Sequence, residues 1–129
     1  MSKVYSISRE NGVVKCDVFT TEENGITSRP LTHRVRHSPT GFEYGYVGSG
    51  PADLALSIMW DAISAEPSAF AYQRFKEVKL ARLQGNGPHE ITHIQILEFL
   101  MVLLLEDFRN NFDIDIPIAK PKCKRNKAI

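Results

Sequence analysis

Alternating apolar and polar residues, the pattern of half-buried β-strands, dominate the beginning of the chain. Residues 3–9 and 13–19 follow this alternation and flank the dipeptide Asn11-Gly12. Asn-Gly is typical of a two-residue hairpin turn, because both turn positions need positive φ angles. The pattern therefore predicts an antiparallel hairpin at the start of the fold.

The length of that turn determines which residues face each other across the hairpin. A two-residue loop places Ile7 opposite Cys16 and Tyr5 opposite Val18. The larger apolar side chains of both strands then share one face, as a half-buried sheet requires. We expect that face to lie in the core.

Three further segments have features of strands. A second Asn-Gly pair, Asn24-Gly25, predicts another turn, and residues 31–37 then alternate between apolar and polar. Aromatic residues at alternate positions predict a fourth strand over residues 42–46. Residues 74–83 fit a helical face or a strand, and the strand is preferred because their apolar residues alternate. The sheet should therefore contain four to five antiparallel strands.

Two long apolar segments have helical character. Residues 51–64 carry only one narrow polar stripe, at spacings of four, four and three residues, formed by Asp53, Ser57, Asp61 and Ser64. Residues 93–108 are mostly apolar, and Thr92 and Gln95 form a capping box that starts this helix at His93. Two such helices need a deep core or a buried dimer surface. The expected fold class is α+β, an antiparallel sheet packed against two main apolar helices.

The size and composition are those of one domain. The chain has 129 residues and 43% hydrophobic residues, which is enough for a core, and residues 1–118 are expected to form it. The longest apolar stretch, residues 94–105, is too short and too interrupted to cross a membrane. The two cysteines, Cys16 and Cys123, form no disulfide framework, and the start of the sequence carries no secretion leader. The expected location is the cytoplasm.

Charge divides the chain into an acidic body and a basic tail. Of the 16 basic residues, five lie in the tail: Lys120, Lys122, Lys124, Arg125 and Lys127. The first 119 residues therefore carry 11 basic and 15 acidic residues. Residues 119–129 lack apolar periodicity and are expected to be disordered in isolation. The tail, with Arg34 and Arg36 on the predicted third strand, could bind nucleic acid, although solvated surface is the preferred interpretation.

A glycine-rich loop precedes the first helix and could hold a phosphate or another anion. Its candidate binding residues are Gly45, Gly48, Ser49 and Gly50. Free N–H groups at a helix start attract anions. However, Pro51 removes one donor, Asp53 adds a negative charge, and the loop matches no established nucleotide motif. A tight turn with Gly50 as helix cap, Pro51 in the first turn and Asp53 complementing the helix dipole is preferred.

The sequence His89-Glu90-Ile91-Thr92-His93 matches the zinc-protease pattern His-Glu-x-x-His. In that mechanism two histidines one helical turn apart hold zinc, and the glutamate polarises the bound water, so all five residues must be helical. The capping box instead leaves His89 in the loop before the helix. Zinc hydrolysis with His89 and His93 as ligands is the least favoured interpretation, and no cofactor is expected.

Three motifs resemble those of a known family. Residues 45–56 read Gly-Tyr-Val-Gly-Ser-Gly-Pro-Ala-Asp-Leu-Ala-Leu, and Tyr72-Gln-Arg-Phe-Lys and Ile96-Leu-Glu-Phe-Leu follow. With these motifs, residues 30–100 resemble a family of small uncharacterised domains found in phages, plasmids and prokaryotic genomes. The core Gly-Tyr-x-Gly-Ser-Gly-Pro-x-x-Leu-Ala-Leu is the specific part of this resemblance. The resemblance implies a mobile-element context and a compact domain without an assigned catalytic site.

Several functions are compatible with these features. The preferred hypothesis is a non-enzymatic binding protein of phage type that acts on a host or defence protein, as anti-CRISPR-like inhibitors do. It follows from the mobile-element resemblance and from the lack of a complete catalytic set. A homodimer through the apolar helices is compatible with it. The alternatives are nucleotide or anion binding by the glycine-rich loop, and nucleic-acid binding through Arg34, Arg36 and the tail.

Overall fold

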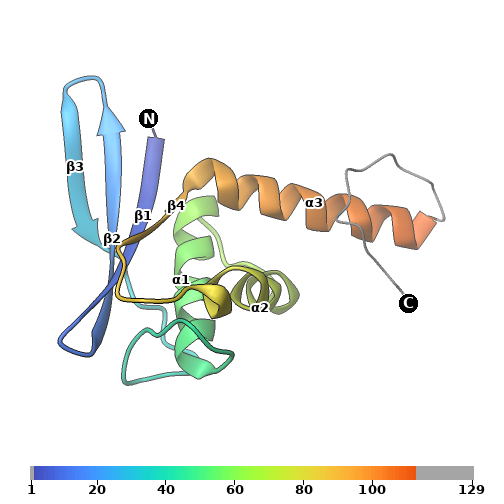
Figure 1. Cartoon of the computed structure of the whole chain (residues 1–129). Helices are drawn as coiled ribbons and strands as arrows, with labels where there is room; N and C mark the ends of the chain where they lie inside the picture. Colours follow the sequence, from blue (N-terminus) through green and yellow to red (C-terminus); the bar gives the residue numbers. More distant parts are fainter. Residues whose placement is uncertain (1, 113–129) are drawn as a thin grey trace.

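The computed structural model describes residues 2–112 of the chain. A four-stranded antiparallel sheet, ordered β3-β2-β1-β4, lies on one side of three helices (Figure 1). The α+β fold predicted from the sequence is confirmed. The predicted basic tail, residues 119–129, lies outside the described residues. Within residues 2–112, no helix combines the length and the hydropathy needed to span a membrane.

The sheet is built around a hairpin of two long strands, β1 (Ser2–Glu10) and β2 (Val13–Glu22). Asn11 and Gly12 connect them with φ angles of 53° and 79°, as the predicted turn requires. The predicted cross-strand pairs are formed, Ile7 with Cys16 and Tyr5 with Val18. All four of these side chains are buried, so the sequence predicted both the register and the core face of the hairpin.

The third strand lies earlier in the chain than predicted. β3 (Gly25–Pro30) pairs with β2 directly after the Asn24-Gly25 turn and ends where Pro30 removes a backbone donor. Residues 31–37, the predicted third strand, form no strand. The N–H of Leu31 still donates to the carbonyl of Cys16 in β2. Further along the segment, the N–H groups of Arg34, Arg36 and His37 donate to polar side chains of α1 instead of to a strand.

The fourth strand is not the aromatic segment predicted over residues 42–46. That segment is a loop, in which Gly45 turns the chain at φ +92° and its N–H donates to the carbonyl of Leu80. Tyr44 is buried, and its hydroxyl donates to the carbonyl of Gly85. Tyr44 thus anchors a loop. The fourth strand is β4 (His89–Thr92), which pairs with the free edge of β1.

The helix α1 (Ser49–Ile63) is the centre of the core, with 11 of its 15 residues buried. Its N-cap is Gly48, because the N–H of Ala52 donates to the carbonyl of Gly48. The prediction of Gly50 as cap is therefore wrong by two residues. Asp53 consequently lies beyond the first turn, where it cannot act as the predicted partner of the helix dipole.

Residues 74–83, predicted as a strand, form no strand and are mostly helical. They fall in α2 (Ala69–Val78) and in a short 3₁₀ helix, η1 (Leu80–Arg82). The Ser68 hydroxyl accepts the N–H of Ala71 and caps α2 six residues before the segment that shows alternation. The helical spacing of the buried residues then places one face of α2 against α1.

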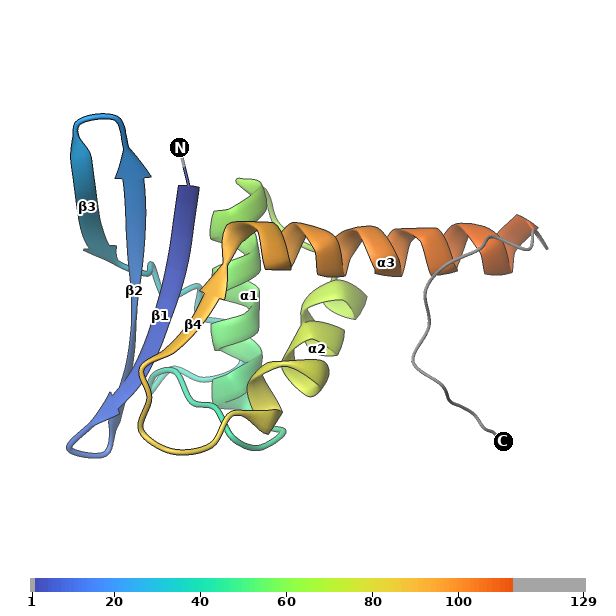
Figure 2. The same cartoon turned by 45° about the horizontal axis from the view of Figure 1, so that its top comes forward.

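The last helix, α3 (His93–Phe112), starts at the predicted residue. The capping box is formed, because the N–H of Gln95 donates to the Thr92 hydroxyl and the N–H of Thr92 donates to the Gln95 side chain. Only the first part of α3 contacts the body of the domain, and the rest projects away from the sheet and from α1 and α2 (Figure 2).

Candidate functional site

The carboxylate of Asp53 binds the segment that follows β3. Asp53 is fully buried and accepts backbone N–H groups from Arg36 at 3.2 Å, His37 at 2.8 Å and Ser38 at 3.0 Å. The Nε2 atom of His33 lies 2.9 Å from the same carboxylate. Asp53 therefore supplies the acceptors that a strand partner would otherwise provide, and it fixes residues 33–38 on α1.

Burial and hydrogen bonding act in opposite directions on the pKa of Asp53. Burial disfavours the charged carboxylate and would raise the pKa. The bond to His33 and the three backbone N–H groups favour the charged form and outweigh burial, so that the pKa lies below its ordinary value of 3.8. Asp53 is thus an ionised structural anchor with its acceptor sites occupied.

A second carboxylate, Asp61, connects α1 to the sheet two turns further along. It accepts hydrogen bonds from the Tyr5 hydroxyl, the Lys3 ammonium at 3.3 Å and the Arg29 guanidinium at 2.6 Å. Burial opposes ionisation of Asp61, but the bonds from Tyr5 and Arg29 hold its pKa below the ordinary value. Burial and the bond to Asp61 raise the pKa of Tyr5. Between these carboxylates, the Ser57 hydroxyl accepts the N–H of Arg34.

The arginines predicted to bind a partner each have a contact within the domain. The Arg34 guanidinium lies over the ring of Trp60, 4.3 Å from its centroid. The Arg36 guanidinium donates to Glu66 at 2.8 Å, and both members of that pair are exposed. Neither arginine lies on a strand, so the predicted shared face of a sheet is not formed. The other predicted cations, Lys120, Lys122, Lys124, Arg125 and Lys127, lie outside residues 2–112.

The glycine-rich loop packs closely against its own neighbours. A Cβ atom at Gly48 would lie 2.6 Å from the ring of Tyr46, and one at Gly50 would lie 2.7 Å from the Cβ of Glu43. The Glu43 carboxylate pairs with Arg9 at 2.6 Å. Gly48 and Gly50 therefore allow other residues to approach the start of α1. An anion at this end of α1 would lie close to Glu43, which is acidic. This packing favours the interpretation of the loop as a tight turn.

We expect Gly50→Ala to destabilise the domain by about 1–3 kcal/mol, because its Cβ would lie 2.7 Å from the Cβ of Glu43 and 3.2 Å from the backbone nitrogen of Glu43. Ser49→Ala is the control, since Ser49 is exposed and its loss should change stability by less than about 0.5 kcal/mol. Urea denaturation measures both variants. The loop is an anion site instead if phosphate raises the melting temperature of the unmodified chain but not that of the two variants, and if both variants fold normally.

The His-Glu-x-x-His sequence does not form the helical turn of a zinc hydrolase. His89 lies in β4, where its Nε2 atom is 3.2 Å from the carbonyl of Gly85. His93 starts α3, and its Nε2 atom is 2.7 Å from the carbonyl of Ala62. In the described part of the chain, no three His, Cys, Asp or Glu side chains are grouped closely enough to hold a metal ion together.

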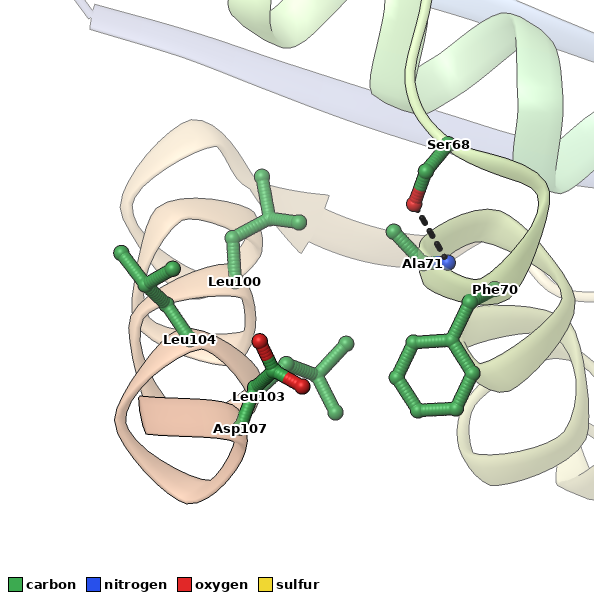
Figure 3. Close-up of a pocket in the computed structure, with 7 residues that line it drawn as sticks. All are labelled: Ser68, Phe70, Ala71, Leu100, Leu103, Leu104 and Asp107. Atoms are coloured by element: carbon green, nitrogen blue, oxygen red, sulfur yellow. Dashed lines mark hydrogen bonds between the residues drawn. The ribbon is translucent and has the colours of Figure 1, made fainter. Parts of the chain in front are cut away.

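An open groove of about 410 Å³ lies between α2 and α3. Its lining is mainly apolar and consists of Ser68, Phe70, Ala71, Leu100, Leu103, Leu104 and Asp107. The ring of Phe70 faces Leu103 and Asp107 across the groove (Figure 3). Phe70 is 67% exposed and Leu104 is 68% exposed, although both are large apolar residues. We call this surface the α2–α3 groove.

These features define a small α+β protein in which Asp53 and Ser57 of the central helix hold the segment after β3, and in which α2 and α3 carry an apolar groove. Residues 10–102 match DUF6166, a family of unknown function, and the chain belongs to this family. The predicted membership in an uncharacterised family is therefore confirmed. No curated protein and no solved structure matches the chain significantly.

Proposed function

We propose that this chain is a non-enzymatic binding protein that engages a host or defence protein through the α2–α3 groove, as an anti-CRISPR-like inhibitor would. The observation that carries this proposal is the exposure of Phe70 and Leu104 on facing helices around an open groove. Large exposed apolar residues that gather around a groove are typical of protein interaction sites.

The arrangement of the polar residues supports a binding role over a catalytic one. Asp53 and Asp61 are held in internal hydrogen bonds. His33 contacts Asp53, His37 contacts the Tyr72 hydroxyl, and His93 contacts a backbone carbonyl. These titratable groups act in the packing of the domain, whereas a general acid or base needs access to its substrate.

The lining of the groove indicates the chemistry of the partner. Its walls are apolar, and Asp107 adds one exposed carboxylate at the rim. A helix or extended segment with apolar side chains and a neighbouring lysine or arginine complements such a surface. We therefore expect the partner segment to be apolar and basic, and the complex to form in the cytoplasm of the host cell.

Affinity capture with variants of the groove tests this proposal. The full chain, Phe70→Glu and the control Ile26→Glu are used as baits in lysates of several bacterial hosts. Phe70 and Ile26 have nearly equal exposure, 67% and 68%, but Ile26 lies on β3, far from the groove in the fold. We expect a captured protein to be lost with Phe70→Glu and kept with Ile26→Glu. Equal capture by all three baits, or none from any host, would contradict the proposal.

A further inference from the structure

The dipeptide Asn-Gly occurs at three places in the chain, Asn11-Gly12, Asn24-Gly25 and Asn86-Gly87. In such a pair the glycine nitrogen loses its proton to solvent and attacks the side-chain amide carbon of the asparagine, where glycine presents no side chain that hinders the approach. A C–N bond forms, the C–N bond of the side-chain amide breaks, and the amide nitrogen takes up a proton and leaves as ammonia. Asparagine is for this reason a thermolabile residue.

The succinimide ring that results opens with water. The hydroxyl adds to one of the two ring carbonyl carbons, and a proton returns to the glycine nitrogen. Opening at one carbon gives aspartate. Opening at the other gives isoaspartate, in which the main chain runs through the former side chain.

The fold decides which of the three pairs can react, because all of them are exposed. The reaction needs the peptide plane between the two residues to rotate, and it needs a glycine nitrogen that is accessible. A plane that is held by a hydrogen bond or by packing must first be released by local opening, and the free energy of that opening slows the reaction.

The pair Asn86-Gly87 is held against β1. The carbonyl of Asn86 accepts the N–H of Arg9 at 2.9 Å. A Cβ atom at Gly87 would lie 2.6 Å from the carbonyl oxygen of Ile7, so the backbone of this pair packs directly on the strand. Its peptide plane can rotate only after the loop separates from β1, and the pair should therefore react slowly.

The pair Asn24-Gly25 is held less firmly. Gly25 is the first residue of β3 and pairs with Glu22 of β2. Glu22 and Glu23 are exposed and precede the pair directly. Their negative charges disfavour the loss of a proton from a nearby N–H group. We expect an intermediate rate at Asn24.

The pair Asn11-Gly12 lies outside both strands of its hairpin, between the paired residues Glu10 and Val13. Within residues 2–112, the N–H of Gly12 has no hydrogen-bond acceptor. A Cβ atom at Gly12 would meet nothing within 4 Å, and the turn lies at the end of the sheet, at the edge of the molecule (Figure 1). We propose that Asn11 is the first residue of this chain to be modified, by spontaneous deamidation to aspartate and isoaspartate.

The two products affect the hairpin differently. Aspartate keeps the length of the turn, and Asp-Gly is itself a favoured pair for it. Isoaspartate adds one carbon atom to the main chain of a turn whose length sets the register of the strands. That register places Tyr5, Ile7, Cys16 and Val18 on the buried face. Isoaspartate at position 11 should therefore lower the stability of the domain.

Peptide mapping by mass spectrometry tests the assignment. The full chain is incubated folded and in urea, and deamidation at the three sites is followed over time. In urea the three pairs should react at similar rates, because each is Asn-Gly. We expect folding to slow Asn11 by less than about threefold and Asn86 by about tenfold or more, with Asn24 between them. The proposal is overturned if Asn11 is protected as strongly as Asn86, or if Asn24 or Asn86 reacts faster than Asn11 in the folded chain.

Two matched variants test the effect on the hairpin. Asn11→Gly cannot deamidate at this position and keeps the turn, because glycine adopts the positive φ that Asn11 has. Asn86→Gly removes the protected site instead. After equal incubation, urea denaturation should show a loss of stability for the unmodified chain and for Asn86→Gly, but not for Asn11→Gly. Equal losses in all three overturn the link between Asn11 and the hairpin. Neither position lines the α2–α3 groove, so these results are independent of the proposed binding function.

Discussion

Replacing Asp53 by alanine should destabilise the domain by about 3–5 kcal/mol, because it leaves three backbone N–H groups and the His33 side chain, in buried or partly buried hydrogen bonds, without their acceptor. Asp53 is fully buried and binds three consecutive backbone N–H groups as well as His33. Without the carboxylate, either water must bind these donors in place or residues 33–38 must detach from α1. We expect the segment to detach and the cooperativity of unfolding to decrease.

The matched control for Asp53 is Ser57, one turn further along α1. Ser57 is 1% exposed and accepts a single backbone N–H, from Arg34. Ser57→Ala should therefore cost only about 1 kcal/mol, the usual value of one hydrogen bond. Urea denaturation followed by tryptophan fluorescence is suitable, because Trp60 lies on α1 beside Arg34. Equal effects of the two substitutions would show that Asp53 is not the anchor of this segment.

Asp53 also makes the free energy of unfolding depend on pH in the acidic range. The pKa of Asp53 in the folded protein lies below its ordinary value of 3.8, so its contribution to stability is fully present above pH 3.8. This contribution is lost as the pH falls through the folded-state pKa. The difference in unfolding free energy between the unmodified chain and Asp53→Ala should therefore shrink below pH 3.8. A difference that stays constant to lower pH would contradict this assignment.

Replacing Gly87 by alanine should destabilise the domain by about 3 kcal/mol or more, through strain and a steric clash together. Gly87 has φ +80°, and a Cβ atom there would lie 2.6 Å from the carbonyl oxygen of Ile7 and 2.9 Å from the backbone nitrogen of His89. Both contacts are with backbone atoms of paired strands, so relief requires β4 to move away from β1.

Gly85 provides the control that separates strain from clash. Its φ is +83°, nearly that of Gly87, but a Cβ atom there would meet nothing within 4 Å. Gly85→Ala should therefore cost about 1–2 kcal/mol, from the left-handed backbone alone. Thermal and urea unfolding of the two variants measure the difference. If Gly87→Ala is no worse than Gly85→Ala, β4 can shift without loss of the core.

The parts of the fold that the sequence predicted depend on local chemistry. The Asn11-Gly12 turn specifies the hairpin register, and the Thr92–Gln95 capping box specifies the start of α3, because each signal lies within a few residues of its effect. The failed strand predictions depend on distant groups. The alternation over residues 31–37 predicts a strand, but Asp53 and Ser57, about twenty residues away, accept the N–H groups of Arg34, Arg36 and His37.

The candidate site was less predictable than the fold. The alternation over residues 74–83 predicts a strand, so Phe70 belongs to no predicted element and the sequence does not indicate the α2–α3 groove. The heptad spacing of Leu97, Met101 and Leu104 is visible in the sequence, but their exposure is not. It depends on where α3 leaves the body of the domain, and only the packing of the helices determines that.

The position of α1 has a consequence for the order in which the chain folds during synthesis. Lys3 and Tyr5 bind Asp61, which follows them by 58 and 56 residues. The hairpin of β1 and β2 can therefore form on the ribosome long before α1 is synthesised. Its apolar face and the side chains of Lys3 and Tyr5 then still lack their contacts with α1. Until α1 emerges, the nascent hairpin exposes Tyr5 and Ile7 to solvent. Contacts between such distant residues slow folding, so chaperone binding should be strongest within this interval of translation.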